Sequence, residues 1–246
     1  MGETFAIPTR VCRPAGAGPF PLAILNHPGA PSPAARQAMR PPGCDTPPAR
    51  WFVSRGYVVA LPLRRGYGDS DAEWAADPGS CASPDYVKSG IEGARDIAAV
   101  ADFLEKSPDV RASGLVVAGE DEGGWAALAF ASVPVNTDLA AVVDVDGGMG
   151  AEAGSDAGHV CRPDLLVDAA RTFGRTTHAG SLLIYASDDP VFAPELARPL
   201  ASAFAAGGAR SVFAAPAAPN AGAHLWFFET GRDAVWGPIL DRFLKS

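Results

Sequence analysis

Apolar residues occur along the chain in short runs bounded by turn residues, and these runs alternate with longer stretches of helical periodicity. This alternation predicts βα units built around a mostly parallel sheet flanked by helices. Several runs are almost continuously hydrophobic, as expected for strands covered on both faces. The predicted strands are Leu22–Asn26, Tyr57–Pro62, Leu115–Ala118, Ala140–Val145, Leu182–Ala186 and Ser211–Ala214, with an earlier edge strand near Phe5–Val11.

The stretches between and after these strands repeat apolar residues at helical spacing or are rich in alanine. The predicted helices are Ile91–Lys106, Glu122–Ser132, Ala193–Ala206 and Arg232–Lys245. Two further segments, Pro28–Ala49 and Gly147–Gly158, are rich in Pro, Gly and Ala. We expect both to be loops over the carboxyl ends of the strands, where an open α/β sheet binds its ligands.

Length and composition predict one α/β domain over residues 1–246, since 246 residues that are 48% hydrophobic suffice for one core. The net charge is −8, and the charged residues form no block of like charge along the chain, which argues against a nucleic-acid partner. No apolar run reaches the roughly 20 residues of a membrane span. The start of the chain has no signal-peptide pattern, so the compartment stays open between cytoplasm and the mature form of an exported protein.

The four cysteines are far apart and form no C-x-x-C pair: Cys12, Cys44, Cys81 and Cys161. This spacing argues against a metal site, and no cofactor is expected. Cys44 and Cys81 lie in Pro/Gly-rich segments, and reduced thiols are favoured over disulfides. The oligomeric state is left open.

The chemistry centres on the segment from Gly119 to Gly124, which lies between a predicted buried strand and a predicted helix. Its pattern G-x-D-x-G has the layout of a nucleophile elbow, G-x-S-x-G, with Asp121 in the place of the serine. The glycines are required because a side chain on either flank of so sharp a turn would strike a neighbouring element. The alternative is a turn aspartate that caps the helix.

Two downstream features complete a possible catalytic triad. The strand Leu182–Ala186 is followed by Asp188 and Asp189, and His224 lies in a loop after the last strand. Nucleophile, acid and histidine in this order are typical of the α/β-hydrolase fold. We favour Asp189 as the acid, because Asp188 is also placed to cap the next helix. A surface histidine is the alternative for His224.

The turn His27-Pro28-Gly29 ends a strand at the position of an oxyanion loop. Pro28 has no N–H, so the donors predicted for a developing negative charge are Glu122 and either Gly29 or Ala30. His27 is expected to be a structural hydrogen-bonding residue beside the substrate. The other residues expected around the substrate are Tyr67, Tyr86, Trp125 and Trp226, of which the tryptophans are more simply pocket wall or core.

The sequence resembles the dienelactone hydrolase-related branch of the α/β-hydrolase superfamily from about Leu22 to its end. The resemblance rests on the elbow together with Trp51–Ala60, Arg64–Asp71, Cys161–Asp164 and Tyr185–Asp189. It implies an α/β-hydrolase fold and a serine esterase or lactonase. The chain departs from the pattern at Asp121 and at Pro28, and no long cap insertion separates Val145 from Leu182.

An aspartate suits different chemistry from a serine. A carboxylate that attacks an ester is expelled again more readily than the alkoxide, but at a saturated carbon it forms a stable alkyl ester. His224, oriented by Asp189, would then activate the water that hydrolyses this ester. The superfamily's epoxide hydrolases and haloalkane dehalogenases use an aspartate in this way, so the resemblance supports an Asp121 nucleophile.

An epoxide is favoured over a halide as the target, because the Glu122 carboxylate would repel halide, whereas Tyr67 or Tyr86 could protonate an epoxide oxygen. Two other functions are considered. In one, Asp121 and His224 are the acid–base pair of a lyase, isomerase or cyclase, which the three successive acids at 120–122 favour. In the other, a serine hydrolase has lost its nucleophile, in nature or by a laboratory Ser→Asp change, and only binds a small molecule.

Overall fold

The computed structural model describes residues 5–70, 72–134, 138–150, 160–217 and 224–245. Within these residues one sheet has the strand order β1-β3-β2-β4-β5-β6-β7, and only β1 is antiparallel to its neighbour. The strands are β1 (Thr9–Cys12), β2 (Leu22–Asn26), β3 (Val58–Pro62), β4 (Ser113–Glu120), β5 (Asp138–Val145), β6 (Gly180–Ile184) and β7 (Ser211–Ala214). The predicted mostly parallel sheet is confirmed. β1 begins later than predicted, after Pro8, which has no N–H to donate to a ladder.

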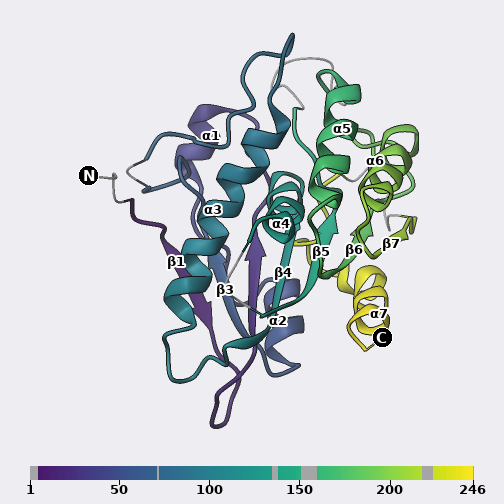
Figure 1. The fold of residues 1–246 in the computed structure, drawn as a ribbon. Helices are drawn as coiled ribbons and strands as arrows, with labels where there is room; N and C mark the ends of the chain where they lie inside the picture. The colour runs from purple at the N-terminus through teal and green to yellow at the C-terminus, as the bar shows by residue number, and fades with distance from the viewer. Residues whose placement is uncertain (1–4, 71, 135–137, 151–159, 218–223, 246) are drawn as a thin grey trace.

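Helices cover both faces of the sheet (Figure 1). They are α1 (Pro33–Ala38), α2 (Pro47–Val53), α3 (Tyr86–Leu104), α4 (Glu122–Ser132), α5 (Pro163–Gly174), α6 (Pro194–Ala206) and α7 (Asp233–Leu244). Successive strand residues point to opposite faces, so Val117 joins the apolar cluster under α3 to α6 while Val116 joins the one under α2 and α7. Among the described residues, no helix combines the length and apolar character needed to cross a membrane.

Three helices were not predicted, and each begins at a proline. The expected loop Pro28–Ala49 contains α1 and the start of α2, and α5 follows the segment Gly147–Gly158, of which residues 151–159 lie outside the described residues. Proline fits the first turn of a helix, because the N–H it lacks would have no partner there. The prolines at 33, 47 and 163 therefore mark the starts of these three helices. Similarly, α3 begins at Tyr86 instead of Ile91, because the Asp85 side chain accepts a hydrogen bond from the backbone N–H of Lys88.

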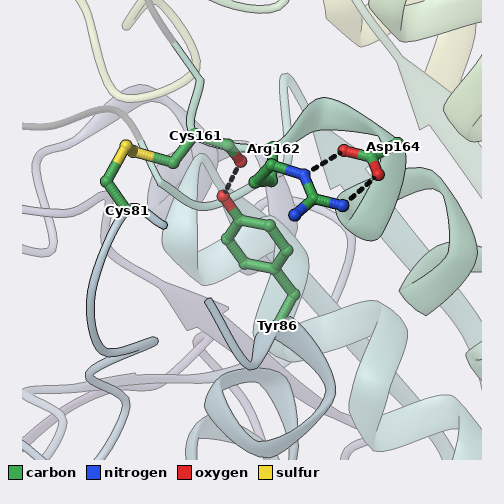
Figure 2. The surroundings of a disulfide bond; sticks show 5 residues. All are labelled: Cys81, Tyr86, Cys161, Arg162 and Asp164. Carbon is green, nitrogen blue, oxygen red and sulfur yellow. Dashed lines mark hydrogen bonds and ion pairs between the residues drawn. A yellow bond between two sulfur atoms is a disulfide. The ribbon is translucent and has the colours of Figure 1, made fainter. Parts of the chain in front are cut away.

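The expectation of reduced thiols is wrong, since all four cysteines form disulfides. Cys12 in β1 bonds to Cys44, and Cys81 bonds to Cys161, with Cα atoms 5.7 and 5.0 Å apart. The second bridge joins the segment before α3 to the segment before α5, and the Tyr86 hydroxyl donates to the carbonyl oxygen of Cys161 beside it (Figure 2). The partners lie 32 and 80 residues apart in the chain. Only the folded topology brings them together.

Candidate active site

The turn from β4 into α4 presents Asp121 at the carboxyl end of the sheet. Asp121 has φ 54° and ψ −123°, a backbone conformation that residues other than glycine adopt only at a cost in free energy. A Cβ added to Gly119 would lie 2.2 Å from the carbonyl oxygen of Gly123, and one added to Gly123 would lie 2.4 Å from that of Asn26. Both flanks of the turn therefore require glycine. The Asp121 carboxylate makes no capping hydrogen bond to α4, so the alternative of a helix cap is excluded.

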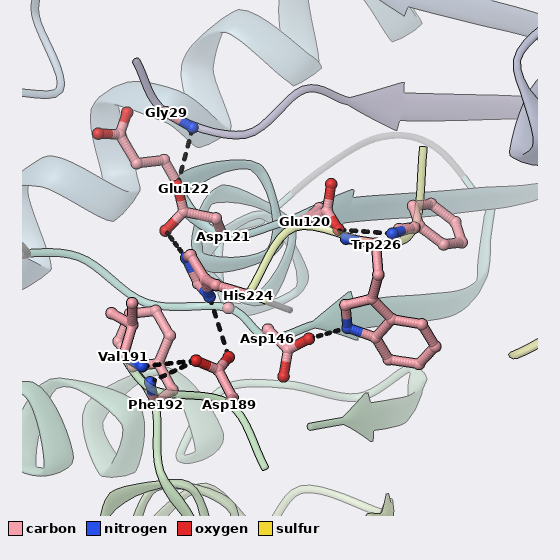
Figure 3. A network of polar contacts seen from close by, with 12 residues as sticks. Gly29, Glu120, Asp121, Glu122, Asp146, Asp189, Val191, Phe192, His224 and Trp226 are labelled. Atoms are coloured by element: carbon pink, nitrogen blue, oxygen red, sulfur yellow. Dashed lines mark hydrogen bonds and ion pairs between the residues drawn. The ribbon is translucent and has the colours of Figure 1, made fainter. Parts of the chain in front are cut away.

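Asp121, His224 and Asp189 lie in one line of polar contacts (Figure 3). His224 Nδ1 is 2.9 Å from Asp189 Oδ2, and His224 Nε2 is 3.5 Å from Asp121 Oδ1. The other Asp189 oxygen accepts hydrogen bonds from the backbone N–H groups of Val191 (2.6 Å) and Phe192 (3.1 Å). Asp189 is buried and held by its own turn. It, and not Asp188, is the acid in contact with His224.

The two carboxylates determine the charge of His224. Burial alone would lower the pKa of this imidazole, but its hydrogen bonds to Asp121 and Asp189, and their negative charges, outweigh burial and raise the pKa to about 10. The resting site at neutral pH therefore holds an imidazolium between two carboxylates.

Gly29 is the oxyanion-loop residue that contacts the site. Its backbone N–H donates to Asp121 Oδ2 at 2.9 Å. Ala30, the other donor considered, instead lines the adjacent cleft. The second oxygen of the Asp121 carboxylate thus occupies the place where an oxyanion would bind.

His27 precedes Gly29 in the same loop and is buried. Its Nε2 lies 3.2 Å from the backbone N–H of Arg64, and its Nδ1 lies 2.6 Å from the carbonyl oxygen of Pro28. The ring is therefore neutral, with Nδ1 as donor and Nε2 as acceptor. Burial, followed by the charge of Arg64, holds its pKa well below the ordinary value. These contacts describe a structural hydrogen-bonding residue.

Sequence reasoning missed two acids that hold the segment following His224. Glu120 points away from Asp121, and its Oε1 accepts from the backbone N–H groups of Trp226 (2.5 Å) and Phe227 (2.6 Å). Asp146, directly after β5, accepts from the indole N–H of Trp226 (Figure 3). One side chain thus fixes the main chain of Trp226 and another fixes its ring. We call this arrangement the histidine-loop clamp. The sequence signal for it was an acid at the carboxyl end of each of two buried strands.

Burial raises the pKa of both acids of the histidine-loop clamp. Burial, opposed by the two N–H donors and reinforced by the charge of Asp121, raises the pKa of Glu120 to about 7. Burial and the neighbouring charge of Asp189 raise the pKa of Asp146 well above its ordinary value. A folded-state pKa above the unfolded one means that stability falls as pH rises through the folded pKa. The raised pKa of His224 has the same sign.

We therefore expect the melting temperature to fall between about pH 5 and 9, and Glu120→Gln to remove part of that fall. The glutamine carbonyl still accepts both N–H groups but carries no charge. Ionisation of a glutamate with a pKa of about 7 costs about 3 kcal/mol. At pH 8.5 Glu120→Gln should melt roughly 6–12 °C above the parent, with little difference at pH 5. Thermal unfolding followed by circular dichroism at both pH values measures this.

The matched variant Glu120→Ala should lower the melting temperature at both pH values, because it leaves two buried N–H groups without an acceptor. Equal pH dependence in the parent and in Glu120→Gln would show that Glu120 does not ionise over this range.

Glu122 turns into a cleft of about 190 Å³ beside the elbow. Its Oε2 accepts a hydrogen bond from the Tyr67 hydroxyl at 2.5 Å and lies 3.7 Å from Arg64 Nη2. Arg36 and Trp74 also line the cleft, and the Arg36 guanidinium stacks 3.8 Å from the ring centre of Trp74. The other lining residues include Ala30, Tyr86, Met149 and both cysteines of the Cys81–Cys161 bridge. Asp121 directly precedes Glu122 in the chain and is not itself among the residues that line this cleft.

The aromatic residues expected around the substrate are buried and already hydrogen-bonded. The Tyr67 hydroxyl donates to Glu122, and the Tyr86 hydroxyl donates to the carbonyl oxygen of Cys161. The Trp125 indole donates to the carbonyl oxygen of Tyr86 at 3.0 Å, and the Trp226 indole belongs to the histidine-loop clamp. Only Tyr86 among these four lines the cleft. Both tryptophans are core residues.

In the described part of the chain, no group of three or more His, Cys, Asp or Glu side chains is arranged to hold a metal ion. The carboxylates at the elbow are partnered by N–H groups, hydroxyl groups and the imidazole.

The chain matches no protein-family model and no curated protein in sequence, but it resembles many solved structures. Dipeptidyl peptidase 4 of Porphyromonas gingivalis superposes with a TM-score of 0.67 at 16% identity, covering 97% of this chain and 33% of the peptidase. Est1E of Butyrivibrio proteoclasticus, solved with ferulic acid, superposes with a TM-score of 0.64 at 13% identity, covering 98% of this chain and 95% of Est1E. A candidate dienelactone hydrolase of Klebsiella pneumoniae superposes with a TM-score of 0.62 at 16% identity, covering 98% of this chain and 93% of the hydrolase.

These neighbours define the class of structure. The chain has the α/β-hydrolase fold, with its mostly parallel sheet and flanking helices. It spans one third of the length of the peptidase, and most of the length of the two smaller proteins. Identities this low establish the fold alone, and the chemistry has to be argued from the site.

Proposed function

We propose that this protein is a hydrolase in which Asp121 is the nucleophile, His224 and Asp189 complete the triad, and the substrate is an epoxide. The observation that carries the proposal is the difference between the two oxygens of Asp121. Oδ2 is held by the Gly29 N–H, whereas Oδ1 faces His224 across 3.5 Å. One oxygen is thus held by a backbone N–H, and the other faces the histidine of the triad.

The reaction has two steps. In the first, Asp121 Oδ1 attacks an epoxide carbon, the ring C–O bond breaks, and an alkyl ester of Asp121 forms. In the second, His224 removes a proton from water, which attacks the ester carbon of Asp121. The negative charge that develops on Oδ2 faces the Gly29 N–H. Collapse of this intermediate releases the diol and restores the Asp121 carboxylate.

The charge of His224 suits this order of steps. An imidazolium between two carboxylates cannot accept a proton, and its pKa of about 10 depends partly on the charge of Asp121. Formation of the ester removes that charge, so the pKa of His224 falls and the ring can lose its proton to solvent. His224 therefore becomes able to accept a proton only after the ester has formed, which is when the second step requires a base.

An epoxide fits the site better than a halide. A leaving halide needs N–H donors, and both nearby indole groups, those of Trp125 and Trp226, donate to protein acceptors. Glu122 adds to the cleft a carboxyl group that a departing halide has no use for, since halide leaves without a proton.

A second candidate is an acid–base enzyme, such as a lyase, isomerase or cyclase, in which Asp121 and His224 transfer protons. The observation that favours it is Glu122, because burial and the charge of Asp121 raise its pKa to about 7, suited to proton transfer at neutral pH. This enzyme would form no covalent ester. A protein that only binds a ligand is less favoured, since it has no need for the contacts among Asp121, His224 and Asp189.

The two disulfides favour an oxidising compartment, where such bonds persist. Of the two locations left open by the sequence, we therefore propose the exported one.

The test of the proposed function is covalent trapping. A His224→Ala variant lacks the base for the second step, so we expect one equivalent of ester to accumulate when it is mixed with styrene oxide. Intact-protein mass spectrometry should show a gain of one epoxide mass, and peptide mapping should locate it at Asp121. The matched variant Asp121→Asn/His224→Ala should gain no mass there. A substrate that turns over without any adduct would favour the acid–base candidate.

A further inference from the structure

The proposed first step requires an acid, because the opened ring leaves an alkoxide. The two tyrosines considered from the sequence are not available for this role in the described structure. The Tyr67 hydroxyl donates to Glu122 and the Tyr86 hydroxyl donates to the carbonyl oxygen of Cys161. His224 faces the attacking oxygen of Asp121, whereas an in-line displacement drives the ring oxygen to the opposite side of the carbon.

We propose that Glu122 is a catalytic residue of this reaction, the acid that protonates the epoxide oxygen as the ring opens. The inference rests on the proposed nucleophilic role of Asp121. Glu122 is the first residue of α4, directly after Asp121, and its carboxyl group borders the cleft. It also lies against the oxyanion loop, since a Cβ added to Gly29 would be 2.6 Å from Glu122 Oε1.

The partners of Glu122 leave one oxygen to carry the proton. Oε2 accepts from the Tyr67 hydroxyl at 2.5 Å and is the oxygen nearest to Arg64 Nη2, at 3.7 Å. The proton of the neutral acid therefore resides on Oε1. Glu122 is buried enough for its ionisation to be costly, with 16% of its side chain exposed.

The charges that face Glu122 favour release of this proton at the right moment. Burial and the charge of Asp121 raise the pKa of Glu122, while the positive charges of Arg64 and Arg36 and the hydrogen bond from Tyr67 oppose the rise. When Asp121 becomes a neutral ester, its contribution disappears and the pKa of Glu122 falls. The negative charge of the site then moves from Asp121 to Glu122, and the alkoxide receives the proton.

The proton balance closes over the cycle. Asp121 gains a C–O bond, the ring C–O bond breaks, and the Glu122 proton neutralises the ring oxygen. Hydrolysis of the ester consumes one water and yields the second hydroxyl group of the diol, the Asp121 carboxylate and one proton. That proton returns Glu122 to its neutral form by way of His224 and solvent. No oxidant, reductant or metal ion is needed.

The experiment compares two electrophiles in the His224→Ala background, where the ester accumulates. Styrene oxide needs an acid for its leaving oxygen, whereas benzyl bromide releases bromide without one. Adding Glu122→Gln should slow the mass gain from styrene oxide by at least about 100-fold, the lower range for general acid catalysis. Alkylation by benzyl bromide should change by less than about 3-fold, since bromide departs without a proton and gains nothing from a general acid.

Two further measurements sharpen the comparison. The rate with styrene oxide should fall as pH rises through about 7, the pKa of Glu122, and this fall should be absent in Glu122→Gln. Glu195→Gln makes the same replacement at the exposed start of α6, outside the cleft, and should leave both rates unchanged. Equal slowing with both reagents would mean that Glu122 only positions Asp121, and would overturn the inference. Absence of any adduct without the Glu122 change would overturn the proposed function as well.

Discussion

Replacing Asp121 with serine is expected to create esterase activity toward activated aryl esters such as p-nitrophenyl acetate. The serine hydroxyl would occupy an elbow whose glycines already permit the required turn, beside His224 and Asp189. The Gly29 N–H, which now donates to Asp121 Oδ2, would become available to an oxyanion. One such donor is worth about 100-fold or more in rate. We expect at least that gain over the parent.

The parent protein should be nearly inactive on these esters, because a carboxylate that adds to the ester carbonyl is less basic than p-nitrophenolate and is expelled faster. Initial rates of p-nitrophenol release measure both proteins. In Asp121→Ser/His224→Ala the gained activity should disappear, which separates triad chemistry from nonspecific hydrolysis. If Asp121→Ser folds and shows no esterase activity, then Pro28 has impaired the oxyanion loop, and the resemblance to serine hydrolases says little about this site.

The parts of the fold that could be predicted from sequence are those that local pattern determines. Buried parallel strands require continuous apolar runs, and the central strands were predicted within a few residues. The elbow was recognisable because its steric demand falls on neighbouring residues, which must be glycine at Gly119 and Gly123. The order of Asp121, Asp189 and His224 followed from the succession of strand ends.

The parts that could not be predicted depend on contacts distant in sequence. Nothing local reveals that Cys81 lies beside Cys161, because 80 residues separate them. The orientation of the Glu120 side chain could not be predicted either. The run of three acids suggested that Glu120 would act on the charge of Asp121, but its side chain points to the opposite side and binds the loop after His224. Burial in the fold raises the pKa of both Glu120 and Glu122.

The route of oxygen separates the two enzymatic mechanisms most directly. If Asp121 is the nucleophile, the oxygen added to the substrate in the first turnover comes from the Asp121 carboxylate, and the oxygen of water enters that carboxylate in its place. If Asp121 only removes or supplies a proton, any solvent oxygen passes directly to the product. The two routes differ completely in where the first label appears.

We therefore expect a single turnover in heavy-oxygen water, with protein in excess over epoxide, to label Asp121 and leave the product unlabelled. Proteolysis and mass spectrometry of the peptide containing Asp121 measure the first, and mass spectrometry of the diol measures the second. Repeated turnovers should then release labelled diol, because the carboxylate now carries solvent oxygen. His224→Ala should incorporate no label, since it cannot activate the hydrolytic water. Labelled product and unlabelled Asp121 in the first turnover would exclude the covalent ester and make Asp121 and His224 a proton-transfer pair.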